Sequence, residues 1–316
     1  MDSEFWIAEL TDDDVPAVVS LCRAALDLPE DAAEAAEIVH RLRGTGGPAT
    51  RRTAGFLALA PAEEKAWSEG AGEEAAAPSN RVIGVVLGSV SHRDPSIGHI
   101  DLIAVDRRER RRGVARALVS RVEGALAGLG ASDVVIAGNP PVYAWPGIDV
   151  RYTPAICAAM ALGFEEDQPA WNMTADLETL GDTEADEARL AGRGVVVRGA
   201  TPADGPALTD FAESNFGRQW AAEITDSTGC HVAVRDGSIL GFAAYGSRPN
   251  WFGPMGTAPA AQGLGIGSVL LKRCLADQKK AGLTSVQIGW VGPMPFYSQV
   301  VGARVERVFF LYRKQL

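Results

Sequence analysis

Apolar and polar positions divide the chain into strand-like and helix-like segments whose order occurs twice. Short apolar runs between turn residues predict strands, and apolar positions three and four apart predict helices. In the first half, strands are predicted over 5–10, 54–60, 82–90, 99–105, 134–138 and 171–177, and helices from Thr11, over 31–43, over 114–126 and before Gly163. In the second half, strands are predicted over 195–198, 232–235, 239–245, 251–256, 286–290 and 305–312, and helices from Thr201, over 269–275 and over 295–301.

The spacing of matching residues supports an internal repeat. Thr11 and Thr201, the two predicted helix starts, are 190 positions apart, whereas Gly113 and Gly265 are 152 apart, so the first copy is 38 residues longer between these points. A fuller second helix and the Ala-, Glu-, Gly- and Pro-rich segment 61–80 account for the difference, and we expect this segment to be a surface excursion that folding does not need. The repeat predicts domains over 1–180 and 195–316, joined by a polar linker over 181–194.

Each half contains a glycine-bearing loop between a predicted strand and a predicted helix. The two loops, Arg110–Arg116 and Gln262–Ser268, share the pattern Gln/Arg-x-x-Gly-x-Gly/Ala. Glycine lets the backbone approach a ligand closely, and the first turn of a helix offers unpaired N–H groups to an anion. The sequence therefore predicts a phosphate site in each half. The glycine-rich segment 44–48 lacks a Walker-type pattern and is interpreted as a plain loop.

The doubled loop resembles the acetyl-coenzyme A (acetyl-CoA) pyrophosphate loop of the GNAT superfamily of N-acetyltransferases, and the chain resembles a tandem two-domain member over nearly its whole length. The resemblance implies an α+β (mixed α/β) fold of two tandem GNAT-like domains, each a twisted, mostly antiparallel sheet flanked by helices. It also implies an acyltransferase that moves an acetyl group from acetyl-CoA to a primary amine of a small molecule or peptide. The amine would attack directly, through a tetrahedral intermediate, and no metal is expected.

The resemblance places coenzyme-binding residues on both loops and on the strand before each loop. In the first half these are Ile103, Val105, Arg110, Arg111, Arg112, Gly113, Val114, Ala115 and Arg116. In the second half they are Met255, Gly256, Thr257, Gln262, Gly263, Leu264, Gly265, Ile266, Gly267 and Ser268. The arginine-rich run 107–112 is open to two other interpretations, a solvated charged surface or a nucleic-acid patch. Its position before the loop glycine favours coenzyme phosphate, because guanidinium groups pair well with phosphate oxygens.

The second half contains a candidate general acid. Acetyl transfer needs a base for the amine, donors for the oxyanion and an acid for the leaving thiolate. Tyr297 matches the family's tyrosine on the last helix and is the candidate acid, the alternative being an aromatic side chain that packs on the sheet. The base position before Thr257 is Gly253, so water, Glu213 or a group that the sequence does not identify would have to deprotonate the amine.

The first half contains a candidate base instead. Asp101, four residues before Val105, is the candidate carboxylate, the alternative being a solvent-facing strand residue. The family tyrosine falls near Ala159, so Tyr143 or Tyr152 would have to replace it, and His99 is interpreted as structural.

Neither copy is complete. We expect the C-terminal copy to be catalytic and the N-terminal copy to retain coenzyme binding and to shape the substrate cleft. The alternatives are an active N-terminal domain or a non-catalytic acyl-CoA-binding regulatory module. A dinucleotide-binding oxidoreductase fits poorly, because the glycines at 263, 265 and 267 do not follow GxGxxG and Thr284 and Ser285 stand where an acid is needed.

Composition adds limits on partners and location. A net charge of −10 and a pI near 5.0 argue against general nucleic-acid binding. No apolar run has membrane-spanning length and no basic leader is present, so a cytoplasmic protein without a membrane partner is expected. The four cysteines stand singly, which favours reduced thiols over disulfides or a metal site. The expected partner is the acceptor amine, and the expected state is a monomer (a pseudo-dimer of two domains) or a homodimer.

Overall fold

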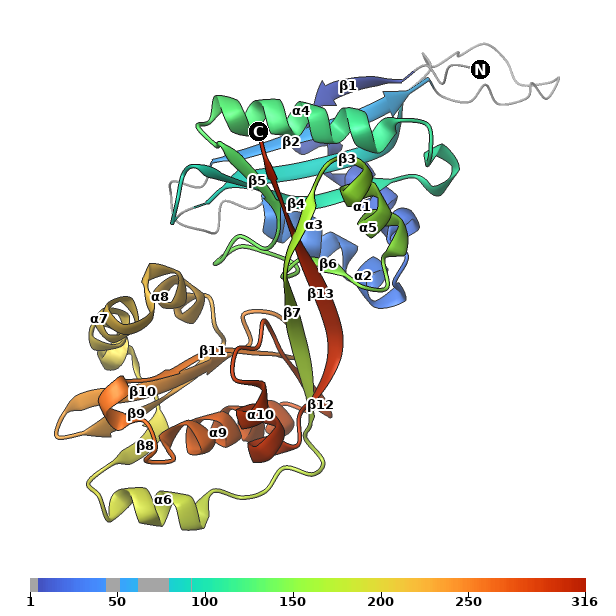
Figure 1. Ribbon diagram of the computed structural model, residues 1–316. Coiled ribbons are helices and arrows are strands. Elements are labelled where there is room, and N and C mark those ends of the chain that lie inside the picture. Colours follow the sequence, from blue (N-terminus) through green and yellow to red (C-terminus); the bar gives the residue numbers. More distant parts are fainter. Residues whose placement is uncertain (1–4, 44–51, 62–79, 92) are drawn as a thin grey trace. The chain divides into compact units, whose positions relative to one another are not determined.

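The computed structural model describes residues 5–43, 52–61, 80–91 and 93–316 (Figure 1). The expected loop over 44–48 and all but the ends of the expected excursion over 61–80 lie outside the described residues. The chain folds into two compact units, which we call unit 1 (Met1–Pro169 with Phe309–Leu316) and unit 2 (Ala170–Val308). The predicted class, a mixed α/β fold built from two tandem units, is confirmed.

The sheet of unit 1 is antiparallel except for one parallel pair. Its strand order is β1 (Trp6–Glu9), β2 (Thr53–Ala60), β3 (Arg81–Val90), β4 (Ile97–Val105) and β5 (Asp133–Ile136), and β4 and β5 are the parallel pair. The short strand β6 (Ile148–Asp149) pairs with Phe309 and Phe310.

Helices cover both faces of this sheet (Figure 1). On one face, α1 (Val15–Ala25), α2 (Pro29–Ala33) and α3 (Ala35–Arg43) pack on β2, β3 and β4, so the helix predicted over 31–43 is divided at Glu34. On the other face, α4 (Val114–Gly128) and α5 (Thr153–Ala161) pack around Leu118, Val122 and Phe164. At Gly88, an added Cβ would lie 2.8 Å from a methyl group of Val122, so the missing side chain lets α4 approach the sheet closely.

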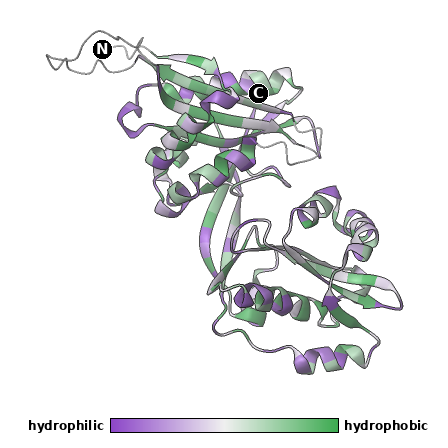
Figure 2. Cartoon of the chain, turned by 180° about the vertical axis from the view of Figure 1, so that it is seen from behind, coloured by the Kyte–Doolittle hydropathy of each residue, from purple (hydrophilic) through white to green (hydrophobic). Residues whose placement is uncertain are grey.

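Unit 2 repeats this arrangement. Its strand order is β12 (Ser285–Ile288), β11 (Trp251–Thr257), β10 (Ser238–Tyr245), β9 (Gly229–Arg235) and β8 (Val196–Gly199), with β11 and β12 parallel. Helices α7 (Gly205–Phe216) and α8 (Arg218–Thr225) cover one face, and α9 (Ile266–Lys280) and α10 (Met294–Val301) cover the other. Figure 2 shows long hydrophobic stretches along the strands and mixed hydrophilic and hydrophobic positions along the helices, as expected for helices with one buried face.

The two predicted helix starts have the same local geometry. The hydroxyl groups of Thr11 and Thr201 donate to Asp14 and Asp204, each over 2.7 Å, and each carboxylate also accepts from the threonine backbone N–H. The 3-10 turns Asp12–Asp14 and Pro202–Asp204 follow directly. Similar turns, Arg107–Glu109 and Pro259–Ala261, precede the two glycine loops.

The last strands of the two halves are exchanged between the units. Residues Met173–Asp176 of β7 (Glu165–Asp176) pair with β12 of unit 2. Residues Tyr312–Gln315 of β13 (Arg304–Gln315) pair with β5 of unit 1. The strand predicted over 171–177 in the first half therefore completes the sheet of unit 2. The sequence does not show this exchange, because an alternating apolar pattern indicates a half-buried strand without specifying its neighbour.

The segment predicted as a linker contains a helix that packs on unit 2. This helix, α6 (Glu184–Ala191), buries Leu190 completely in the core beneath α9. Its Glu187 accepts two hydrogen bonds from Arg273 of α9, over 2.7 and 2.5 Å. Among the helices in the described ranges, none combines the length and hydropathy needed to cross a membrane.

Candidate active sites

The central parallel strands of unit 1 separate partway along their length. Strands β4 and β5 pair from Ile97 to His99, and β4 then continues to Val105 without β5 beside it. The pairing between β3 and β4 shifts by one residue between Leu102 and Ile100, so Asp101 is the extra residue of a bulge. The separation frees the backbone edge of β4 on the side of β5, where a ligand can take the place of a strand.

Unit 2 has the same separation at the equivalent position. Strands β11 and β12 pair only at Trp251 and Phe252, and the pairing of β10 with β11 shifts between Phe252 and Met255. Thr257 pairs with Gly241 as Val105 pairs with Gly84, and Gly253 is therefore the counterpart of Asp101. A backbone opening is present in both units, but only unit 1 has a carboxylate at its bulge.

The two glycine loops have matching backbone conformations. The left-handed region is occupied by Arg111 (φ 65°) and Gly113 (φ 87°) in unit 1 and by Gly263 (φ 77°) and Gly265 (φ 86°) in unit 2. The second residue of each pair, Gly113 or Gly265, is the N-cap of a 15-residue helix, α4 or α9, and no side chain of the described residues caps either helix. The first-turn N–H groups of both helices are therefore available to an anion.

Much of the positive charge near the first loop is neutralised within the protein. Glu109 is buried and pairs with Arg81 at 2.5 Å and with Arg112 at 2.9 Å. Arg110 donates to the carbonyl oxygen of Ala25 at 2.7 Å and to Asp27 at 3.2 Å. Arg110 thus connects the loop to the end of α1, a structural role that the sequence pattern did not indicate.

Two of the exposed arginines of the first loop make no ion pair in the described part of the chain. These are Arg111 and Arg116. They are the guanidinium groups of this loop that can reach a phosphate without first losing a protein partner. Val114, by contrast, is buried in the core, and Ala115, Ile103 and Val105 are half-buried.

The second loop has no arginine of its own, and α6 supplies one. Arg189 donates from Nη1 to the carbonyl oxygen of Leu264 at 2.7 Å and from Nη2 to Asp186 at 3.0 Å. Its Nη2 atom lies 2.5 Å from the position that a Cβ atom would take at Gly265. Sequence reasoning missed this contact, because Arg189 lies far from the loop in the chain and carries no motif.

The remaining predicted coenzyme residues of unit 2 divide into core and surface positions. Ile266 is buried in the core, and Met255 packs against it, with its methyl group 3.1 Å from a Cβ position at Gly267. At Gly256, the ring of Phe216 fills the place of a side chain. Gln262 and Gly263 are exposed, and Thr257, Leu264, Gly267 and Ser268 are half-buried; Gly265 is half-buried as well.

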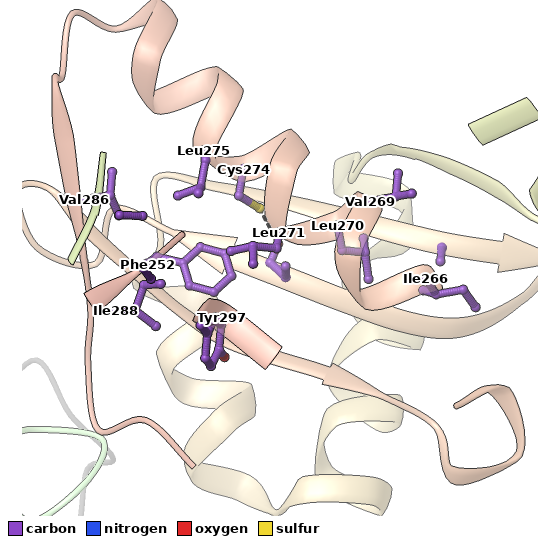
Figure 3. Close-up of a cluster of buried hydrophobic side chains, with 14 of the residues drawn as sticks. Phe252, Ile266, Val269, Leu270, Leu271, Cys274, Leu275, Val286, Ile288 and Tyr297 are labelled. Atoms are coloured by element: carbon purple, nitrogen blue, oxygen red, sulfur yellow. Dashed lines mark hydrogen bonds between the residues drawn. The ribbon is translucent and has the colours of Figure 1, made fainter. Parts of the chain in front are cut away.

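Tyr297 lies in the core of unit 2 with its ring among apolar side chains (Figure 3). It is 8% exposed and packs edge to face against Phe252 and Phe296. Burial raises the pKa of its hydroxyl to about 12, so the group stays protonated at neutral pH. Its hydroxyl makes no hydrogen bond with another described residue.

Unit 1 has no tyrosine at this position. Tyr297 stands five residues before Gly302, and the residue five before Gly163 is Ala158, next to the expected Ala159. Neither alanine has a hydroxyl group. Tyr152, a proposed substitute, donates its hydroxyl proton to Asp31 at 3.0 Å.

The other candidates of unit 1 and unit 2 have different surroundings. Tyr143 is buried, and Asp101 is half-buried at the bulge. His99 is buried with its Nδ1 atom 3.0 Å from the carbonyl oxygen of Ala137, and Glu213 is exposed on α7. In the described ranges, no group of three or more His, Cys, Asp or Glu side chains is arranged to hold a metal ion.

The family assignment rests on two matches to one sequence model. The model of the acetyltransferase (GNAT) family matches residues 48–144 and 201–294, which together make up more than half of the chain. The chain belongs to the GNAT acetyltransferase family. Each match contains one glycine loop, so the chain is a tandem GNAT protein, and membership in this family supports acyl transfer as the general activity.

Solved structures share the tandem GNAT fold at low sequence identity. A GCN5-related N-acetyltransferase from Sphaerobacter thermophilus is 19% identical with a TM-score of 0.66, over 98% of this chain and 95% of that one. A tandem GNAT protein from the clavulanic acid biosynthesis pathway is 16% identical with a TM-score of 0.65, over 99% of this chain and 98% of that one. At these identities, the two similarities show that this chain shares the fold of those proteins.

A third similar structure is much longer than this chain. It contains a GCN5-related glucosamine N-acetyltransferase region of a fungal multi-domain GH3 β-N-acetylglucosaminidase, at 18% identity and a TM-score of 0.76. The match covers 99% of this chain but only 38% of that one. No curated protein matches the chain.

Proposed function

We propose that this GNAT protein is an N-acetyltransferase that uses acetyl-CoA to acetylate a primary amine of a small molecule or peptide, with the chemistry in unit 2. The observation that carries the proposal is the combination in unit 2 of an uncapped glycine loop, separated central strands and a buried, protonated Tyr297. Unit 1 has the first two features and lacks the third. We propose that unit 1 retains coenzyme binding.

The second loop fits a diphosphate. Apart from the chain neighbours of Gly263, no atom in the described ranges lies within 4 Å of a Cβ position at this residue, so these ranges leave the loop open on that side. The first N–H groups of α9 and the helix dipole favour negative charge at this point. The freed edge of β11 after Phe252 then offers backbone groups to the amide-rich pantetheine arm, in the place of a neighbouring strand.

Of the two proton transfers that the reaction needs, unit 2 has a candidate donor for the leaving sulfur but no carboxylate at the usual position of the base. The amine nitrogen attacks the thioester carbonyl and a C–N bond forms, while the carbonyl oxygen takes up negative charge. When the tetrahedral intermediate collapses, the C–S bond breaks and the Tyr297 hydroxyl donates its proton to the sulfur. The ammonium proton leaves to water or to Glu213, because Gly253 offers no carboxylate.

A second candidate places the chemistry in unit 1. Asp101 stands at the bulge of β4, where a carboxylate can accept the proton of an attacking amine. The third candidate is a non-catalytic acyl-CoA-binding regulatory module, which the incomplete catalytic sets favour. The first two candidates predict turnover of acetyl-CoA, which depends on unit 2 in the first and on unit 1 in the second. The third candidate predicts no turnover.

Matched substitutions at the left-handed loop positions test coenzyme binding. Aspartate tolerates this conformation, so both substitutions cause little backbone strain: Arg111→Asp replaces a positive charge with a negative one, and Gly263→Asp adds a negative charge. We expect each to weaken acetyl-CoA binding by its own unit in calorimetry. If neither does, the coenzyme assignment is wrong.

Turnover with a panel of amines separates enzyme from binding module. Thiol release from acetyl-CoA and the mass of the acetylated product report the reaction. The proposal is supported if Gly263→Asp abolishes turnover and Arg111→Asp leaves it unchanged. The opposite pattern would place the chemistry in unit 1. Coenzyme binding without turnover on any amine supports the regulatory module.

A further inference from the structure

The side chain of Arg189 lies against the backbone of the second glycine loop. Its Nη1 atom donates to the carbonyl oxygen of Leu264 at 2.7 Å, and its guanidinium group fills the space beside the α-carbon of Gly265. We propose that Arg189 is a positioning residue for the coenzyme: it fixes the peptide between Leu264 and Gly265 so that the Gly265 N–H points at the diphosphate. The inference rests on the proposed use of acetyl-CoA by unit 2.

The orientation follows from the geometry of the peptide bond. In a trans peptide, the C=O and N–H groups point in opposite directions. Because Arg189 holds the Leu264 carbonyl toward α6, the N–H of Gly265 points away from α6. Donation to the carbonyl oxygen also polarises the peptide, which makes its N–H a stronger donor to an anion.

A loop with glycines at 263, 265 and 267 needs such a restraint. Glycine populates both signs of φ, so an unrestrained Gly265 would leave the direction of its N–H poorly defined. The guanidinium group is itself held in place, since Nη2 also donates to Asp186 at 3.0 Å. Helix α6 is anchored by the buried Leu190 and by the ion pair of Glu187 with Arg273.

Unit 1 is restrained by other means. Apart from its chain neighbours, no described residue has an atom within 4 Å of a Cβ position at Gly113, so no described side chain there takes the place that Arg189 has in unit 2. Its loop instead has the side-chain-bearing Arg111 at the first left-handed position, and Arg112 is paired with the buried Glu109. The segment expected to be a simple linker therefore completes the coenzyme loop of unit 2.

Calorimetry on the full chain tests the role of Arg189. The parent carries Arg111→Asp, so that binding by unit 1 is suppressed and the measurement reports unit 2. In this parent we expect Arg189→Ala to raise the Kd for acetyl-CoA roughly 10-fold, the scale of one charge-assisted hydrogen bond. Arg189→Lys should recover part of the loss. Arg193→Ala removes an equal charge from an exposed position near α6 and should leave the Kd within about twofold.

The choice of ligand separates positioning from general destabilisation. 3′-Phosphoadenosine 5′-diphosphate carries the diphosphate but no pantetheine arm, and its binding should fall as that of acetyl-CoA falls. S-acetyl-pantetheine carries no diphosphate, and its binding, followed by NMR titration, should not change. A merely structural role would weaken both fragments.

Two results would overturn the inference, and they differ from a failure of the proposed function. The inference is wrong if the parent binds acetyl-CoA and Arg189→Ala binds it equally well, or if S-acetyl-pantetheine binding falls as much as phosphate binding. If the parent and the wild-type chain both fail to bind acetyl-CoA, the proposed function fails first and the inference with it. Arg189→Lys keeps the test valid if the alanine variant does not fold.

Discussion

The rings of Tyr297 and Phe252 meet edge to face in unit 2, with centroids 6.3 Å apart and planes inclined at 75°. Phe252 is the last residue of β11 that pairs with β12, so this contact places Tyr297 where the two strands begin to separate. Figure 3 shows the side chains of Phe252 and Tyr297 next to each other. A protonated hydroxyl at that point is suited to meet the sulfur of a coenzyme lying along the opening.

The first prediction concerns the role of this hydroxyl in catalysis. Tyr297→Phe keeps the ring and its packing but removes the proton donor. We expect kcat to fall by roughly 10²–10⁴-fold, with little change in the Kd for acetyl-CoA. Asp101→Asn in unit 1 is the matched control and should cost less than about 10-fold. The reverse ranking, measured by steady-state kinetics, would place the active site in unit 1.

The second prediction concerns stability at alkaline pH. The pKa of Tyr297 is raised to about 12 in the folded protein from 10.0. The folded state therefore holds the proton more tightly than the unfolded chain, and the associated stability is complete below pH 10 and is lost as the pH rises toward 12. Melting temperatures across this range should fall more steeply for the wild type than for Tyr297→Phe. Parallel curves would contradict the burial of the hydroxyl.

The third prediction follows from the exchanged strands. Tyr312 is 2% exposed and packs in the core of unit 1, although it lies at the end of the chain. Tyr312→Ala should destabilise unit 1 by about 3–5 kcal/mol, as for other large-to-small core changes. Hydrogen exchange should show the loss of protection over β2 to β5.

A surface substitution on the same strand provides the control for this experiment. Val305 is 40% exposed, and Val305→Ala should change stability by no more than about 0.5 kcal/mol.

The reciprocal experiment uses Leu177, which follows β7 and is buried in unit 2. Leu177→Ala should reduce protection against hydrogen exchange in unit 2. Loss of protection in unit 2 on Tyr312→Ala would mean that β13 completes the other sheet.

The fourth prediction compares the two loop glycines. Gly113 and Gly265 have nearly equal φ values, 87° and 86°, so an alanine pays the same backbone strain at both, about 1–2 kcal/mol. At Gly265 the new methyl group would also collide with Arg189. Gly265→Ala should therefore cost more stability than Gly113→Ala, and adding Arg189→Ala should remove the excess in a double-mutant cycle. Equal costs at both glycines would show that Arg189 moves aside freely.

The fifth prediction separates two neighbouring arginines. Arg110→Ala removes hydrogen bonds to Ala25 and Asp27 and should reduce the stability of unit 1 by about 1–3 kcal/mol. Arg111→Ala removes an exposed side chain and should leave the melting temperature nearly unchanged while weakening acetyl-CoA binding in low salt. A destabilised Arg111→Ala with normal binding would contradict this division of roles.

Features of the fold that depend on neighbouring residues follow from the sequence. Thr11 with Asp14 and Thr201 with Asp204 form their hydrogen bonds within one turn, so the helix starts could be predicted. The left-handed glycines at the two loops are set by the absence of a side chain, a property of the residue itself. The same locality let the repeated pattern of strands, loops and helices indicate the fold and the family.

Features that depend on distant residues were decided only by the tertiary structure. The alternation in β7 and β13 predicts that these strands are half-buried, but backbone pairing is similar for any neighbour, so the exchange could not be foreseen. Arg110 and Arg189 are polar residues whose partners lie far away in the chain, at Ala25 and Leu264. A single sequence does not record such pairs, because their free energy arises only when folding removes both partners from water and brings them together.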